Sequence, residues 1–144
     1  MTAEKQSALQ TIEEKKSLIT GIADKIWGFA ELSLQEFKSA ETYCEALEKE
    51  GVEVTYIAPD KDGVVSAEDI LAAVREDTFL VSVMAVNNEV GSLQPLDKIK
   101  EGLPADVHFH VDAVQAAGHR PADSYAFADT VAMSGHKFYG PKGV

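Results

Sequence analysis

The chain has 144 residues, 45% hydrophobic and 26% charged, which is the composition of a globular protein with a core of its own. Its formal net charge of -11 argues against nucleic acid and anionic membrane surfaces as partners, because both require a basic face. No run approaches the roughly 18 continuous apolar residues of a membrane span. The polar N-terminus lacks the apolar core of a secretory signal, and a single cysteine, Cys44, fits a reducing compartment. We therefore expect a cytoplasmic protein.

The first 50 residues have the pattern of two helices. Apolar residues at three- and four-residue steps predict a helix from about Ala3 to Gly28. Ser33 is the predicted cap of a second helix, Glu36 completes its capping box, and Gly51 supplies a left-handed stop. The residues predicted to form the buried face of this second helix are Phe37, Ala40, Cys44 and Leu47.

After Gly51 the chain alternates between predicted strands and short helices. Ser66 and Pro95 are expected to open two of these helices, and residues 60–63 form a turn cluster. Such alternation predicts a parallel α/β sheet with its site at the carboxyl ends of the strands. The predicted strands are residues 52–57, 79–84, 107–111 and 130–133. Three polar residues fall just after predicted strands: Asn87, Asp112 and Lys137.

An acidic residue after one strand and a lysine after the next are what a pyridoxal phosphate enzyme needs. The Asp112 carboxylate could hold the ring nitrogen protonated, which makes the ring an electron sink. Lys137 could form a Schiff base with the cofactor aldehyde. Gln115 could donate to the phenolic oxygen, and Ser134 and His136 could donate to the phosphate.

Simpler roles compete with this interpretation. An aspartate after a strand most often caps a turn, a lysine is most often solvated, and a lone histidine is usually structural. His110-x-Asp112 has the spacing of dizinc hydrolases, but no further ligand set follows, so no metal site is expected. Cys44 lies on an apolar helix stripe and is expected to be a structural thiol. A non-enzymatic module that packs through its apolar helix faces is a further alternative.

From about residue 47 to residue 144 the chain resembles cysteine desulfurases, within the class V aminotransferase group of pyridoxal phosphate enzymes. The residues that carry this resemblance lie at 47–56, 86–91, 109–115 and 134–143. The resemblance implies a partial three-layer sheet of the fold-type I large domain. It also implies Lys137 as the cofactor lysine, Asp112 at the ring nitrogen, Gln115 at the phenolic oxygen, Ser134 and His136 at the phosphate, and Asn87 near ring and substrate. The family desulfurates L-cysteine to alanine, leaving a persulfide for iron–sulfur cluster synthesis, and the resemblance implies a homodimer for the full enzyme.

The N-terminal third looks different. Residues 26–41 are similar to the opening helices of dizinc aminoacylase-type amidohydrolases, a segment that carries no metal ligand. We therefore expect a helical segment at 1–50 joined to a partial cofactor-binding domain at 51–144, and a hydrolase fragment remains an alternative. The sulfur-accepting cysteine loop and the C-terminal domain are expected beyond Val144. On that basis we expect weak cofactor binding and no turnover by this chain alone.

Overall fold

A computed structural model describes residues 2–31 and 37–141 of the chain. The chain divides into two compact units, Met1–Val54 and Thr55–Val144, and each is described by itself. The predicted capping box of Ser33 and Glu36 lies outside the described residues.

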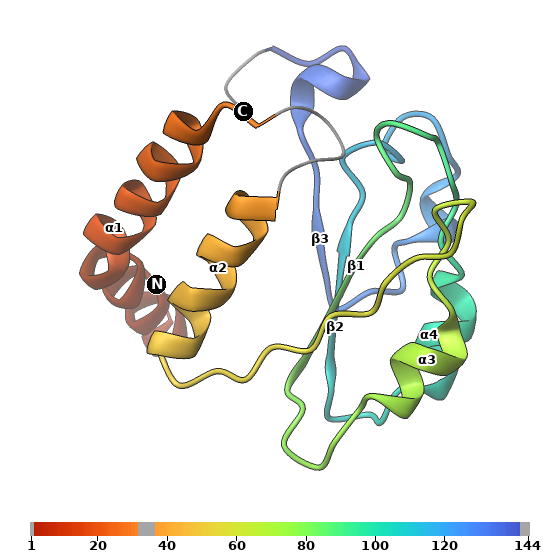
Figure 1. The fold of residues 1–144 in the computed structure, drawn as a ribbon, viewed down its shortest axis with the longest axis horizontal. Helices are drawn as coiled ribbons and strands as arrows, with labels where there is room; N and C mark the ends of the chain where they lie inside the picture. Colours follow the sequence, from red (N-terminus) through yellow and green to blue (C-terminus); the bar gives the residue numbers. More distant parts are fainter. Residues whose placement is uncertain (1, 32–36, 142–144) are drawn as a thin grey trace. The chain divides into compact units, whose positions relative to one another are not determined.

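The first unit consists of two helices, α1 (Ala3–Phe29) and α2 (Phe37–Lys49) (Figure 1). The predicted stop at Gly51 is confirmed, because this residue has a φ of 84° in the left-handed region. The amide of Val52 donates to the carbonyl of Leu47 at 2.9 Å, which closes the helix end as a Schellman motif does. Neither α1 nor any other described helix has the length and apolarity needed to cross a membrane.

The buried face predicted for α2 is wrong. Ala40 is exposed, Leu47 is 44% exposed and Cys44 is half-buried, whereas Thr42 is buried at 6%. The side chain of Phe37 lies outside the described residues. Within the first unit, two paired helices bury a narrow line of contact, and Thr42 lines the groove between α1 and α2. Within this unit the buried position of α2 is therefore Thr42 and not the predicted apolar stripe.

The second unit is built on a parallel sheet of three strands in the order β1 (Leu80–Met84), β2 (His108–Asp112) and β3 (Thr130–Ala132) (Figure 1). At the carboxyl ends of the strands Met84 pairs with Asp112, and Asp112 pairs with Ala132. The predicted α/β class with a parallel sheet is confirmed.

The fourth predicted strand, residues 52–57, is absent from this sheet. An extended run becomes a strand only when a neighbouring strand completes its backbone ladder, and in the described chain β1, β2 and β3 pair only with one another. The apolar content of the run has a packing role instead, because Ile57 packs against the core of the second unit.

The core lies between one face of the sheet and the helices α3 (Ala67–Ala72) and α4 (Leu96–Gly102). Figure 1 shows both helices on the same side of the strands. As predicted, Ser66 caps α3, and its side chain accepts a hydrogen bond from the backbone amide of Asp69 at 3.1 Å. The fully buried large side chains are Phe109, Ile99 and Val111.

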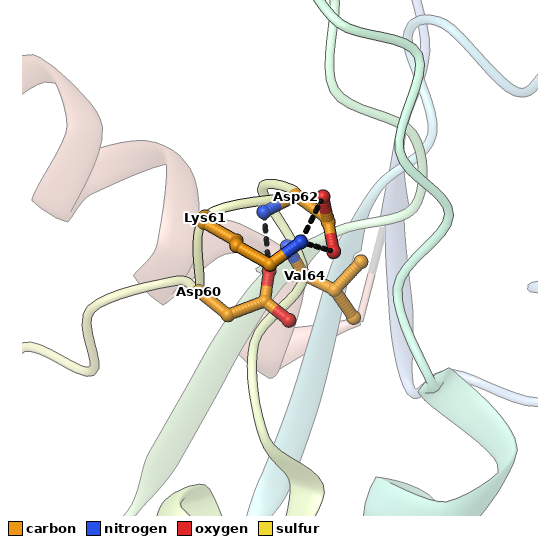
Figure 2. A network of polar contacts seen from close by, with 4 residues as sticks. All are labelled: Asp60, Lys61, Asp62 and Val64. Atoms are coloured by element: carbon orange, nitrogen blue, oxygen red, sulfur yellow. Dashed lines mark hydrogen bonds and ion pairs between the residues drawn. The ribbon is translucent and has the colours of Figure 1, made fainter.

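The predicted turn at 60–63 is also confirmed. One carboxylate oxygen of Asp60 accepts from the backbone amides of Asp62 and Val64, both at 2.9 Å, as Figure 2 shows. The pKa of Asp60 lies below its usual value, mainly because its carboxylate accepts the hydrogen bond from the Val64 amide. Lys61 pairs with the Asp62 carboxylate at 3.0 Å. Gly63 completes the turn with a φ of 76°.

This turn is tied to the segment that follows β1. The side-chain amide of Gln94 donates to the carbonyl of Gly63 at 2.8 Å, and its oxygen accepts from the amide of Val65 at 2.8 Å. Ser92 also donates to the Gly63 carbonyl, at 2.7 Å. The loop after β1 is therefore held by side-chain hydrogen bonds at its far end.

Candidate cofactor-binding site

The predicted site residues lie at the carboxyl ends of strands or in the segments that follow them. Because Met84, Asp112 and Ala132 are in register, the three connecting segments leave the sheet at the same edge. Figure 1 shows these segments at one end of the strands.

Asp112 ends β2, the central strand, on the face opposite to the buried Phe109 and Val111. One carboxylate oxygen accepts from the amide of Val114 at 2.9 Å, so the simpler role of turn former is fulfilled by this oxygen. The other carboxylate oxygen has no hydrogen-bond partner within residues 2–31 and 37–141. Asp112 can therefore hold its own turn and still accept a hydrogen bond from a ligand.

Gln115 lies in the turn that follows Asp112 and is half-buried. Its side-chain amide makes no hydrogen bond to any described part of the chain, so both its donor and its acceptor are available.

Asn87 holds the turn that follows β1. Its side-chain oxygen accepts from the amides of Glu89 and Val90 at 2.9 and 3.0 Å. Its side-chain nitrogen lies 3.6 Å from the sulfur of Met84. In this structure Asn87 shapes the turn after β1.

Ser134 and His136 form a hydrogen-bonded pair, with the hydroxyl oxygen 2.8 Å from Nδ1 of the ring. If the hydroxyl donates to Nδ1, the ring carries its proton on Nε2; if Nδ1 donates, the hydroxyl proton is directed elsewhere. In either tautomer the pair keeps one proton to donate to an anion.

Lys137 lies in a short 3-10 helix, η2 (Gly135–Phe138), and is exposed. Its amine makes no ion pair or hydrogen bond with the described residues. The ring nitrogen Nε2 of His119 lies 3.2 Å from the Lys137 carbonyl oxygen, which ties η2 to the turn after β2. Gly118 has a φ of 78°, and a methyl group there would lie 2.5 Å from Cβ of Phe138. These contacts hold the segments that carry Lys137 and Asp112 against each other.

Sequence reasoning missed Gly118 and His119 as residues that position this edge. A glycine directly after Ala116 and Ala117 is a left-handed stop signal that could have indicated the turn. No local pattern indicates the contact of His119 with the main chain of η2.

The donor set at this edge fits pyridoxal phosphate chemically. It offers an unpaired carboxylate oxygen, an unpaired amide, an unpaired amine, and a hydroxyl–imidazole pair that keeps a proton. Two grooves with volumes of about 230 and 400 Å³ lie between α1 and α2, and the candidate residues line neither of them.

These features define an α/β protein whose candidate site lies at the carboxyl edge of a parallel sheet. The chain belongs to the aminotransferase class-V family, whose model matches residues 31–144. The match starts upstream of residue 47, where the resemblance was expected to begin, and so it includes α2. The alternative of a dizinc amidohydrolase is not supported by these comparisons.

The curated relatives include the cysteine desulfurase IscS of Serratia proteamaculans, 47% identical over 114 residues. The corresponding protein of Escherichia coli is 46% identical over the same length. The aligned region is 78% of this chain and 28% of the relative in both cases, so the chain spans about 28% of the length of these relatives.

Solved structures agree with this family. A NifS-like protein has a TM-score of 0.65 at 41% identity and covers 73% of this chain and 30% of its own. DndA from Streptomyces lividans has a TM-score of 0.65 at 40% identity, covering 73% and 29%. SspA in complex with cysteine has a TM-score of 0.64 at 38% identity, covering 74% and 31%.

Proposed function

We propose that the chain binds pyridoxal phosphate at the carboxyl edge of its sheet and supplies the cofactor lysine, Lys137, of a cysteine desulfurase that acts on L-cysteine. The observation that carries the proposal is the divided role of the Asp112 carboxylate, with one oxygen holding the turn and the other unpaired. The remaining parts of the proposal follow from family membership: a homodimeric, cytoplasmic enzyme that mobilises sulfur for iron–sulfur clusters.

Asp112 is the group that would hold the ring nitrogen. The hydrogen bond from the Val114 amide fixes the orientation of the carboxylate, and its unpaired oxygen can accept an N–H. A negative charge at this point favours the protonated form of a ring nitrogen. The bound cofactor would supply an electron sink for bond breaking at the α-carbon of the substrate.

The other candidate residues would bind and orient. The unpaired amide of Gln115 can donate to the phenolic oxygen. The Ser134–His136 pair can donate its remaining proton to a phosphate oxygen. Lys137 would bring an amine to the aldehyde. Asn87, whose side-chain oxygen holds the turn after β1, would lie near the ring and the substrate.

Reductive trapping of the cofactor tests this proposal. The purified chain is incubated with pyridoxal phosphate, reduced with borohydride, digested and mapped by mass spectrometry. We expect the label on Lys137, its loss in Lys137→Ala, and its retention in the matched control Lys100→Ala, because Lys100 lies on α4 and pairs with Asp129. Label spread evenly over surface lysines, or equal total label in Lys137→Ala, would contradict the proposal.

Asp112→Asn gives a second measurement. The amide keeps an oxygen that can accept from Val114 but loses the charge that favours a protonated ring nitrogen. We expect weaker cofactor binding, measured by absorbance titration, with the turn retained by circular dichroism. An unchanged affinity for pyridoxal phosphate would show that Asp112 does not hold the ring nitrogen.

A further inference from the structure

Two histidines and a threonine converge on the face of the sheet that α3 and α4 do not cover. His108 and His110 lie two positions apart on β2, so both point away from the core side that holds Phe109. Thr130 is the register partner of His110 on β3. Nε2 of His108 and Nδ1 of His110 each lie 2.9 Å from the hydroxyl oxygen of Thr130.

The three atoms that meet here, two imidazole nitrogens and a hydroxyl oxygen, could also bind a metal ion. A threonine hydroxyl has one proton, so it can donate to only one of two neutral rings and must accept from the other. One nitrogen of each imidazole is therefore directed at the Thr130 hydroxyl oxygen, and all three residues lie on strands of the sheet. Imidazole nitrogen is a ligand that Zn²⁺, Cu²⁺ and Ni²⁺ all accept.

We propose that His108 and His110, together with Thr130 and solvent, form a binding site for a divalent transition-metal ion of this group. Each ring nitrogen lies 2.9 Å from the Thr130 oxygen, an ordinary hydrogen-bond separation, so an ion would enter by replacing these hydrogen bonds with bonds to the ring nitrogens.

The surroundings allow such an ion to enter. His108 and Thr130 are exposed, and the chain as a whole carries a net charge of -11, which attracts cations. One oxygen of the nearby Asp129 carboxylate accepts hydrogen bonds from the amide of Phe109 and from Lys100, and the negative charge of this carboxylate lies close enough to interact with His108. In the described part of the chain no three His, Cys, Asp or Glu side chains form a metal-binding group. The proposed site is therefore a two-nitrogen site with positions open to solvent and exchangeable ligands.

Isothermal titration of the untagged chain with Ni²⁺, and separately with Cu²⁺ and Zn²⁺, tests the site at a pH where imidazole is mostly neutral. We expect one ion per chain and at least a tenfold loss of affinity in His108→Ala and in His110→Asn, since even outer-shell mutations commonly cost about 10–100-fold. Mg²⁺ prefers oxygen ligands and should not bind. His119→Ala is the matched control, because this histidine lies outside the convergence and should leave metal affinity unchanged.

Wild-type affinity in His108→Ala would overturn the proposal, as would an equal loss in His119→Ala. Circular dichroism checks that each variant is folded. If His110→Asn is unfolded, the exposed His108 decides the question alone, because its substitution removes no buried contact. The inference does not depend on cofactor binding: Lys137→Ala should lose the cofactor label and keep the metal, so the failure of either idea is seen separately.

Discussion

Substitution of Gly118 by alanine should disturb the cofactor lysine without touching it. Gly118 has a φ of 78°, and an added methyl group would meet Cβ of Phe138 at 2.5 Å. Ordinary contact requires about 3.5 Å, so η2 must move by roughly 1 Å, and Lys137 is the neighbouring residue of η2. The perturbation thus combines backbone strain with a displacement of the candidate site.

The two costs can be separated by a matched variant. An alanine in the left-handed region costs about 1–2 kcal/mol, and overpacking adds about 1–3 kcal/mol. Gly91 has a φ of 73° in the same unit, but a methyl group there has no neighbour within 4 Å. We expect Gly118→Ala to lower the free energy of unfolding by about 2–5 kcal/mol, and Gly91→Ala by about 1–2 kcal/mol.

Urea denaturation measures the stability, and borohydride trapping measures the yield of cofactor on Lys137. A displacement near 1 Å at a reactive group can reduce its reactivity by about 100-fold. We therefore expect Gly118→Ala to trap far less cofactor than Gly91→Ala under conditions where both are folded. Equal stability and equal trapping in the two variants would refute the packing of η2 on the turn after β2.

Two further predictions concern the core and its pH dependence. Phe109→Ala removes a fully buried ring and should lower the free energy of unfolding by about 3–5 kcal/mol in urea denaturation; a loss below 1 kcal/mol would place this ring outside the core. The hydrogen bond from the Phe109 amide, and then Lys100, hold the pKa of Asp129 below its usual value. A carboxyl group with a lowered folded-state pKa stabilises the fold above its unfolded value of about 3.9, and this contribution is lost as the pH falls through the folded value. Asp129→Asn should therefore be less stable than the natural chain at pH 7, and the difference should vanish under acid; a difference that persists unchanged at pH 2 would contradict the assignment.

Several elements could be predicted because their signals are local. The left-handed stop at Gly51, the cap at Ser66 and the turn at Asp60 each depend on residues within one helical turn or one loop. The position of Asp112 at the end of β2 followed from the length of an apolar run. At these points the physics that forms the element acts between near neighbours in the sequence.

The misses depend on contacts between distant residues. Residues 52–57 have the composition of a strand, but a strand also requires a neighbouring strand to pair with. Composition alone does not show whether such a neighbour is present. The buried side of α2 is decided by how α1 lies against it, so Thr42 replaced the expected apolar stripe. Likewise, the contact of His119 with η2 joins residues 18 positions apart and leaves no periodic trace.

The order of the strands has a consequence for how the chain acquires its structure. Three parallel strands in the order β1-β2-β3 need two long crossover connections, and both must form before the sheet is complete. Because both crossovers are expected to be right-handed and step across the sheet in the same direction, they lie on the same face of the sheet. Contacts between α1 and α2 join segments that are close in the sequence, and such helical pairs form in microseconds, whereas non-local sheets are slower. The N-terminal helices are therefore expected to order first during synthesis, and the sheet edge that carries Asp112 and Lys137 is completed last.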